Sequence, residues 1–386
     1  MSKVSSSNGL EKCPKLRFPG SDEPWTEIKI GDIFKVTRGN VLSAALVSSI
    51  KSNRYVYPVF SSQTKDDGLM GYYDDFLFED AITWTTDGAN AGTVHFRKGK
   101  FYCTNVCGVL LNPYGYANRC TAEILGRVSK RYVSYVGNPK LMNNVMLEIR
   151  IYIPSLVEQA HIDNFLLALD KKIDKQRHLV DLLKKYKRGL NHKLLFEIDG
   201  QNYQELGTVC SIVSGGTPDT LRPEYWEGSV EWFTPSEIGK SKYALSSLRK
   251  ISQLGLSNSS AKLLPVGAVL LTTRATLGEM SIARSECSTN QGFQSLIADS
   301  KRVLPEYLYY LQILIKPWCE KYASGNTFRE ISKASLSKCV VPVPRLNSQK
   351  KIVCILSRID DLIEKHKYME KSLTQIKEGL SQQLFI

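Results

Sequence analysis

The residues that could carry catalysis lie in short, incomplete motifs. Asn112-Pro113-Tyr114-Gly115 contains part of the Asn/Asp-Pro-Pro-Tyr/Phe loop of amino-methyltransferases, but it lacks the second proline, and no glycine-rich cofactor loop follows a strand. A turn is the better interpretation. No Gly-x-x-x-x-Gly-Lys-Ser/Thr phosphate loop occurs, and Asp66-Asp67 and Asp74-Asp75 lack the spaced Glu-x-Lys that nuclease metal sites commonly use. We therefore expect no enzymatic activity from this chain by itself, and no cofactor.

A metal site is not expected either. Cys103 and Cys107 are close, with His95 upstream, but a zinc site needs a second ligand pair at defined spacing, and the chain has only 5 histidines. Two small core residues on a strand explain this pair better. The 9 cysteines are odd in number and irregularly spaced, and Met1 to Leu10 is polar, without a signal-peptide core. We expect reduced thiols in a cytoplasmic protein.

The charge of the chain favours a polyanionic partner. The 386 residues carry a formal net charge of +13, spread over the whole length and not gathered in one tail. Cations that neutralise phosphates release counterions, so such an excess suits a long molecule that lies along a nucleic acid. Many basic proteins bind no nucleic acid, so the charge alone does not decide the function.

Part of the sequence occurs twice. A shift of 190 positions places 153–196 on 343–386, with 13 identities in 44 positions and no gap. The identical pairs include Pro154 and Pro344, Gln159 and Gln349, and Asp170 and Asp360. Both copies carry apolar residues at alternating steps of four and three, which is the seam of a coiled coil. The predicted seam comprises Ile162, Leu166, Leu169, Ile173, Val180, Leu183 and Leu190, and then Ile352, Leu356, Ile359, Ile363, Leu373 and Leu380.

The two seams most simply pack on each other as one antiparallel pair of long helices. Each helix follows one module, 28–152 or 200–342, and these modules also correspond, though more loosely. Ile30-Gly31-Asp32-Ile33 aligns with Leu206-Gly207-Thr208-Val209, and Gly39 aligns with Gly215. Further pairs are Thr85-Thr86 with Thr272-Thr273, and Thr104-Asn105 with Thr289-Asn290. Short β-like runs between Gly, Pro and Asn turns predict an α+β module with a pseudo-two-fold internal repeat.

The sequence resembles the specificity subunits of Type I restriction–modification systems. The resemblance rests on Pro14-Lys15-Leu16-Arg17-Phe18-Pro19-Gly20 with Trp25, and on Ser214-Gly215-Gly216-Thr217-Pro218. Tyr225-Trp226-Glu227-Gly228, Glu231-Trp232-Phe233-Thr234 and the helix entries at Ile153-Pro154 and Val343-Pro344 extend it over nearly the whole chain. The first module departs from the pattern, with Thr37-Arg38-Gly39-Asn40 in place of Gly-Gly-Thr-Pro.

The resemblance implies two target recognition domains that read the two halves of a split double-stranded DNA site. The helices would act as a spacer and dock two methylation subunits, with restriction subunits joining outside. The implied parts are an N-terminal segment (1–27), target recognition domain 1 (28–152), spacer helix 1 (153–199), target recognition domain 2 (200–342) and spacer helix 2 (343–386). Methyl transfer and DNA cleavage would belong to the partner subunits.

Base reading needs hydrogen-bonding side chains on loops that enter a groove, surrounded by cations that bind phosphate. In the first domain the candidates are Arg38, Asn40, Thr86, Asp87, Asn90 and Asn105. In the second they are Thr217, Thr234, Ser236, Arg274, Thr276, Asn290 and Gln291, with Asn326, Thr327 and Arg329 on a further loop. Arg274 can grip guanine in bidentate fashion, or it can instead pair with Glu279 at the surface. We interpret the run 184–188 as a solvated or partner-facing helix surface.

Two other functions remain open at this point. The chain could be a coiled-coil adaptor that bridges proteins without reading DNA. It could also be a free-standing methyltransferase or nuclease, which the missing motifs disfavour. Salt separates the first alternative, because the affinity of a DNA reader for duplex falls steeply as salt rises.

Overall fold

The structure is a computed structural model that describes residues 2–3, 14–62, 65–197, 202–274, 276–325 and 329–385. The chain forms two compact units. The first unit comprises Met1–Arg177 with Tyr368–Ile386, and the second comprises His178–Lys367. Each unit therefore holds one α+β module and part of each long helix.

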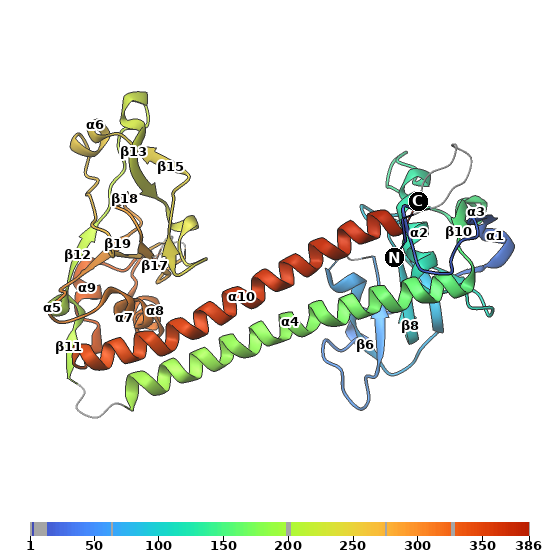
Figure 1. The fold of residues 1–386 in the computed structure, drawn as a ribbon, viewed down its shortest axis with the longest axis horizontal. Coiled ribbons are helices and arrows are strands. Elements are labelled where there is room, and N and C mark those ends of the chain that lie inside the picture. Colours follow the sequence, from blue (N-terminus) through green and yellow to red (C-terminus); the bar gives the residue numbers. More distant parts are fainter. Residues whose placement is uncertain are drawn as a thin grey trace. The chain divides into compact units, whose positions relative to one another are not determined.

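The two long helices are α4 (Leu156–Phe196) and α10 (Leu346–Leu384) (Figure 1). Pro154 and Pro344 lie just ahead of the first turns, where a proline costs no helical hydrogen bond. Gln159 Nε2 donates to the carbonyl of Pro154 at 2.9 Å, and Gln349 Nε2 donates to the carbonyl of Pro344 at 2.8 Å. The repeated Pro and Gln of the sequence thus form the same helix entry twice.

The helices run antiparallel in each unit, as predicted. In the first unit Asp170 pairs with Lys377 and Arg177 with Glu370, so positions rise along α4 as they fall along α10. In the second unit Lys187 pairs with Asp360 in the same sense. The seam positions Ile162, Leu166, Ile173, Val180, Ile352, Leu356, Ile359 and Ile363 are buried, and Leu169, Leu183, Leu190, Leu373 and Leu380 are half-buried.

The first unit is built on a six-stranded sheet in the order β4-β9-β7-β8-β5-β6. These strands are β4 (Lys35–Arg38), β5 (Tyr57–Phe60), β6 (Leu69–Tyr73), β7 (Phe78–Thr85), β8 (Val94–Cys103) and β9 (Cys107–Leu111). Two small sheets pair β1 (Ser2–Lys3) with β2 (Leu16–Arg17) and β3 (Thr26–Lys29) with β10 (Arg150–Ile153). The helices are α1 (Ile30–Ile33), α2 (Arg119–Ser129) and α3 (Asn143–Glu148), with 3₁₀ turns η1 (Ala44–Leu46), η2 (Lys65–Gly68) and η3 (Lys130–Tyr132).

The second unit has a five-stranded sheet in the order β12-β19-β16-β17-β14, a three-stranded sheet β15-β13-β18 and the pair β11-β20. The strands are β11 (Tyr203–Glu205), β12 (Cys210–Ser214), β13 (Trp226–Phe233), β14 (Tyr243–Ala244), β15 (Arg249–Ile251), β16 (Val269–Leu271), β17 (Met280–Ala283), β18 (Cys287–Thr289), β19 (Gln294–Ala298) and β20 (Val340–Pro342). The helices are α5 (Leu206–Val209), α6 (Gln253–Ser257), α7 (Pro305–Tyr310), α8 (Gln312–Tyr322) and α9 (Lys333–Ser337), with η4 (Pro223–Tyr225) and η5 (Pro235–Glu237).

Each module shares one hydrophobic core with the long helices. In the first unit Trp84 and Met146 pack in one cluster with Ile162 of α4 and Leu384 of α10. In the second unit Tyr307 and Leu308 pack with Leu195 of α4 and with α10. Burying one such large apolar side chain stabilises the fold by roughly 1.5–3 kcal/mol. The shared cores therefore fix each module to the parts of the two helices in its own unit.

The shift of 190 positions extends beyond the helices. It places α3 on α9 and β10 on β20, and the amides of Ile30 and Leu206 donate to Ile149 and Cys339 at 2.9 and 2.8 Å. The N-terminal motif also has a structural role: Arg17 grips Glu158 at the start of α4 with Nε–Oε1 and Nη2–Oε2 distances of 3.0 and 2.6 Å. Both side chains are buried, so this motif anchors the chain end to α4.

Candidate nucleic-acid interface

Three loops of the first unit meet at one end of its six-stranded sheet. The amide of Gly39, which follows β4, donates to Cys107, and the amide of Asn40 donates to Cys103, at 3.0 and 3.2 Å. The amide of Thr86, which follows β7, donates to Val106 at 2.9 Å. The turn between β8 and β9 therefore holds both other loops, and Asn105 is exposed at its tip. These loops carry all of the candidates predicted in this domain.

The aligned loops of the second unit meet in the same way. The amide of Gly216, which follows β12, donates to Thr289 at 2.8 Å, and the amide of Thr273 donates to Gly292 at 2.8 Å. A fourth segment joins them, because the amide of Asn290 donates to Phe233 at 3.2 Å. Asn290 and Gln291 take the place of the turn that holds Asn105 in the first unit.

The aligned glycines explain this equivalence. A Cβ added to Gly39 would lie 2.2 Å from the carbonyl oxygen of Cys103, and one added to Gly215 would lie 2.0 Å from that of Asn290. Real side chains do not tolerate such distances from backbone atoms. Both units therefore need a glycine where the first loop crosses the turn, and this shared need produces the alignment seen in the sequence.

Several residues of the Gly-Gly-Thr-Pro and Trp motifs hold the loop in place. Trp232 Nε1 donates to the carbonyl of Gly216 at 3.0 Å, and Trp226 Nε1 donates to that of Asp219 at 3.1 Å. The Arg249 guanidinium lies over the Trp226 ring, 3.5 Å from its centroid. The tryptophans thus shape the loop, and the polar side chains on it remain available for contact. Thr217 Oγ1 donates to Gln291 Oε1 at 2.6 Å, which ties two candidate contacts together.

The structure places the predicted residues unequally. Half-exposed or exposed on the converging loops are Arg38, Asn40, Asp87, Asn90, Asn105, Thr217, Thr234, Ser236, Arg274, Thr276, Asn290 and Gln291. Arg329 is exposed beside α8, where its guanidinium donates to the carbonyl of Glu320. Asn326 and Thr327 lie outside the described residues.

Thr86 requires a correction. Its side chain is fully buried, and its hydroxyl lies 2.6 Å from Asp87 Oδ2 and 3.0 Å from the carbonyl of Val106. A buried hydroxyl in this position orients Asp87 and cannot reach a base edge itself. Asn90 is similarly engaged, since its Nδ2 donates to the carbonyl of Ser62 at 3.0 Å.

Arg274 pairs with Glu330 and not with Glu279. The distance from Arg274 Nη2 to Glu330 Oε2 is 2.8 Å, and Thr273 Oγ1 donates to the same carboxylate at 3.4 Å. Glu279 instead pairs with Lys316 at 2.5 Å. The Arg274 side chain is 42% exposed, and an ion pair at such a surface is worth about 0–1 kcal/mol. Arg274 can therefore leave Glu330 for a base or a phosphate at little cost.

Arg38 is a second cation at a recognition edge. It lies 4.0 Å from Asp87, with 38% of its side chain exposed. Its Nε is buried and has no hydrogen-bond partner among the residues that the structure describes. A guanidinium held this loosely has donors left for DNA.

Arg97 is a buried cation of the first domain that sequence analysis did not single out. Burial lowers the pKa of its guanidinium to about 10, which leaves it charged at neutral pH. Its Nε donates to Thr83 Oγ1 at 3.0 Å, and its guanidinium lies over the Phe60 ring, 3.7 Å from the centroid. Burial also lowers the pKa of the neighbouring His95. The packing holds Arg97 inside the module.

Sequence analysis missed two carboxylates, Glu237 and Glu330, that bond to candidate residues on the converging loops. Glu237 Oε2 accepts from the amide and the hydroxyl of Thr234 at 2.8 and 2.6 Å and forms a capping box. The Thr-x-x-Glu spacing could have revealed it. Glu330 has no such local signal, because it lies far along the chain from Arg274.

The Asn112-Pro113-Tyr114-Gly115 segment forms a turn. Asn112 Oδ1 accepts from the amide of Tyr114 at 2.7 Å, which makes a turn, with Tyr114 exposed. Cys103 and Cys107 are buried in the core of the first module. Within the described ranges, no group of three or more His, Cys, Asp or Glu residues is placed to hold a metal ion. No helix in the same ranges has the length and apolarity to cross a membrane.

Two stretches of the chain match the model of one protein family. Residues 22–185 and 199–375 each match the profile of the Type I restriction modification DNA specificity domain. The chain belongs to this family. It is 33% identical over 187 residues to the Type I restriction enzyme MjaIX specificity subunit of Methanocaldococcus jannaschii, which covers 47% of this chain and 43% of that protein. The Type I restriction enzyme MpnII specificity subunit of Mycoplasma pneumoniae is 33% identical over 155 residues, 39% of this chain and 46% of that one.

The chain thus matches about half the length of these two relatives. A solved structure agrees over more of the chain. The crystal structure of a Type I restriction–modification system S subunit from M. genitalium has a TM-score of 0.61 at 19% identity. It covers 97% of this chain and 99% of that one, so the two proteins share a fold.

Proposed function

We propose that this chain is the DNA sequence-specificity subunit of a Type I restriction–modification complex. The observation that carries the proposal is the repeated interface: in both units the same aligned glycine and the same polar turn bring loops with exposed donors and acceptors to one edge. Such loops can enter a groove and contact base edges. Their sequences differ between the units, so each domain reads its own half of a split site.

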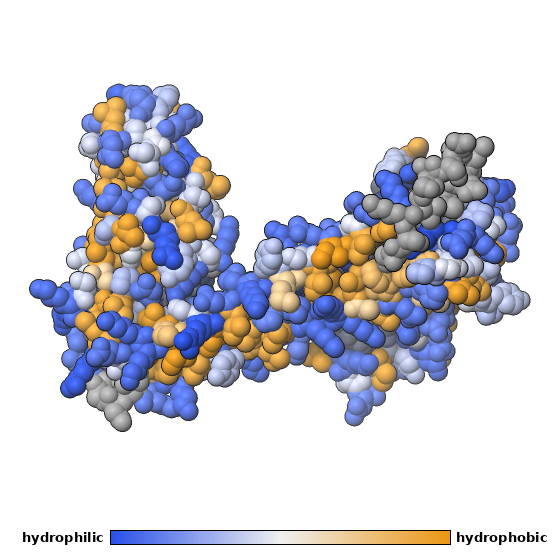
Figure 2. Space-filling model, viewed as in Figure 1, coloured by the Kyte–Doolittle hydropathy of each residue, from blue (hydrophilic) through white to orange (hydrophobic). Residues whose placement is uncertain are grey.

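The family and the surfaces of the helices support the partners that we propose. The complex contains double-stranded DNA, two methylation subunits and restriction subunits, and it works in the cytoplasm. Apolar atoms reach the surface along the long helices (Figure 2). Tyr186 and Ile376 are related by the shift of 190 and are 61% and 50% exposed. Two equivalent exposed apolar positions suit two copies of one protein partner better than a DNA backbone.

The chain has no catalytic role of its own in this proposal. Methyl transfer and DNA cleavage come from the partner subunits. The alternative, a coiled-coil adaptor without DNA recognition, would not need the convergent polar loops at either sheet edge.

A module exchange tests the proposal. Residues 28–152 are replaced by the corresponding module of a relative with a different target, the complete complex is expressed in cells, and the methylated bases are mapped. We expect one half of the recognised sequence to change and the other half to stay. If both halves change, or if no split site is methylated by a folded complex, the proposal is wrong.

A further inference from the structure

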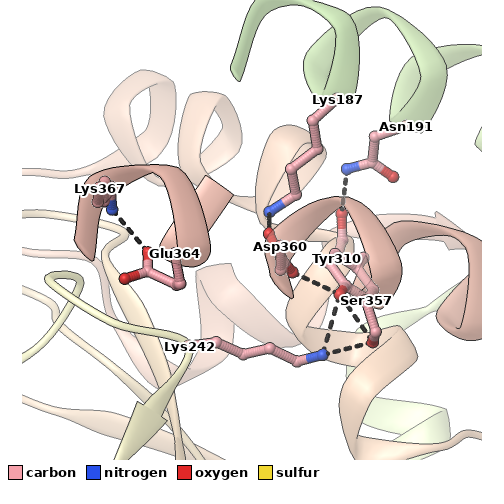
Figure 3. A network of polar contacts seen from close by, with 8 residues as sticks. All are labelled: Lys187, Asn191, Lys242, Tyr310, Ser357, Asp360, Glu364 and Lys367. Carbon is pink, nitrogen blue, oxygen red and sulfur yellow. Dashed lines mark hydrogen bonds and ion pairs between the residues drawn. The ribbon is translucent and has the colours of Figure 1, made fainter. Parts of the chain in front are cut away.

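Asp360 of α10 joins three parts of the second unit. Its Oδ1 lies 2.5 Å from Lys187 Nζ on α4, and its Oδ2 accepts a 2.6 Å hydrogen bond from the hydroxyl of Tyr310, the last residue of α7 (Figure 3). The backbone carbonyl of Tyr310 accepts from Asn191 Nδ2 of α4 at 2.9 Å. One carboxylate therefore connects the two helices to each other and to the recognition domain. The adjacent basic run is mainly a helix surface, but Lys187 is only 22% exposed and faces this junction.

Lys242 extends the junction toward the recognition loops. Its Nζ donates to the hydroxyl of Tyr310 at 2.9 Å and to Ser357 Oγ of α10 at 2.8 Å. Lys242 follows the loop that carries Thr234 and Ser236, and its carbonyl accepts from the amide of Ile282 in β17 at 2.8 Å. Burial lowers the pKa of Lys242, so the network around it replaces water that this ammonium has lost. A recognition loop is thereby tied to the helix within a few residues.

The first unit repeats this arrangement with other side chains. Asp170 Oδ1 lies 2.7 Å from Lys377 Nζ, and Asp170 Oδ2 pairs with the guanidinium of Arg119, the first residue of α2. The shift of 190 positions aligns Asp170 with Asp360 and Lys187 with Lys377. In both units, then, one carboxylate oxygen binds the lysine of the opposite helix, and the other oxygen binds a donor from the recognition domain.

We propose that Asp170 and Asp360 are positioning residues that set the orientation of each recognition domain on the helix pair. This inference rests on the proposed function. It assigns a role to an identity in the repeat that a helix seam alone does not require, because Asp170 and Asp360 lie beside the apolar seam positions and not at them. An ion pair such as Arg177–Glu370 joins the two helices only, whereas each aspartate also holds a domain. A tilted domain would still recognise its bases, but at a different distance from the other half-site.

The test uses the complete complex with its methylation subunit. Methyl transfer is measured on duplexes that carry both half-sites with the native gap, and with the gap longer or shorter by one base pair. The variants are Asp360→Asn and Tyr310→Phe. Glu364→Gln is the matched control, since Glu364 lies one turn along α10 and, among the described residues, forms its ion pair with the neighbouring Lys367, at 2.7 Å and largely in solvent.

We expect Asp360→Asn to reduce the preference for the native gap by about tenfold, in line with the coupling usual within a hydrogen-bonded network. Tyr310→Phe should reduce it less, because it removes one donor and leaves the Lys187 pair intact. Discrimination between bases in both half-sites should stay as in the unaltered protein, and Glu364→Gln should change neither property.

A lower Tm with unchanged gap preference in both variants would mean that the junction is merely structural and would overturn the proposal. Lost base discrimination in the half-site of the second domain would overturn it as well, since the aspartate would then support the whole domain. If Asp360→Asn fails to fold, Tyr310→Phe decides, because it retains the ring and the carboxylate. A complex that methylates no split site even with the unaltered chain would refute the proposed function instead.

Discussion

Lengthening both long helices together should lengthen the gap between the two half-sites. The change is a helix-favouring tetrapeptide inserted between Arg177 and His178 of α4, with the same tetrapeptide between Lys367 and Tyr368 of α10. These two places are related by the shift of 190, and they are the places where the chain passes between its two compact units. Neither insertion interrupts the pairs Asp170–Lys377 or Lys187–Asp360 inside a unit.

The magnitude follows from helix geometry. Four residues add ~6 Å at ~1.5 Å per residue. DNA rises ~34–36 Å over ~10–10.5 base pairs, so ~6 Å corresponds to one or two base pairs. An insertion of four residues continues the alternation of steps of four and three as a stutter, so the seam stays nearly in phase. The bases read at each end should not change.

The assay is methylome sequencing of cells that carry the complete system with each variant. Two controls sharpen it. The tetrapeptide in α4 alone should lower Tm, because α10 cannot follow and one unit must slip out of register along Ile359 and Ile363. A two-residue insertion in both helices rotates each seam by ~200° and should prevent assembly. An unchanged gap in a folded complex with the matched four-residue insertion would refute the idea that the helices measure the distance.

Three further outcomes are expected. Arg274→Ala should cost about 1–3 kcal/mol of DNA-binding free energy at one base position if the arginine contacts guanine, as measured with duplexes substituted position by position. An equal loss of affinity for every sequence would mean that Arg274 contacts phosphate instead. Glu330→Gln, which frees the arginine, should not weaken DNA binding. Gly39→Ala and Gly215→Ala should each lower the free energy of unfolding by about 1–3 kcal/mol or more, because the new Cβ meets a carbonyl oxygen in both. Gly189→Ala is the control and should not lower it, because the space around Gly189 is open. Denaturant titration measures all three variants. The purified chain alone should show no methyl transfer, nuclease or ATPase activity with labelled substrates, and detectable methylation without partner subunits would contradict this.

The fold was predictable where the physics is local or periodic. The seam from Ile162 onward, the helix entries at Pro154 and Pro344 and the antiparallel pairing all follow from spacing and repetition in the sequence. The relation between the modules was visible in the sequence only as a few aligned pairs, although β13 pairs in parallel with β18 as β5 pairs in parallel with β8. The structure shows why those few pairs survive: Gly39 and Gly215 stand where the backbone leaves no room for a side chain.

The site was predictable only in outline. Residue types indicate which loops carry hydrogen-bond donors, but not which donors the fold itself uses. Thr86 fits by residue type, but its side chain is fully buried. Glu279 is near Arg274 in sequence and was the expected partner, whereas the fold brings up Glu330 from the segment after α8, much farther along the chain. Lys187 looked like one member of a solvated basic run, and only its antiparallel partner helix reveals the carboxylate that it faces.

Contacts between the two long helices recur in both units, whereas contacts made by the modules differ between the units. Asp170 and Asp360, with Lys377 and Lys187, keep equivalent partners because each aspartate lies between the opposite helix and a module. A change at one such position must fit the opposite helix as well as the module beside it, so few substitutions are tolerated. The hydrogen-bond donors to the aspartates, Arg119 and Tyr310, each belong to one module only, and they are different residue types. The candidate base-contacting side chains that the structure describes have no hydrogen bond or ion pair to either long helix, so the helices place no direct limit on the sequence that each domain would use to read DNA.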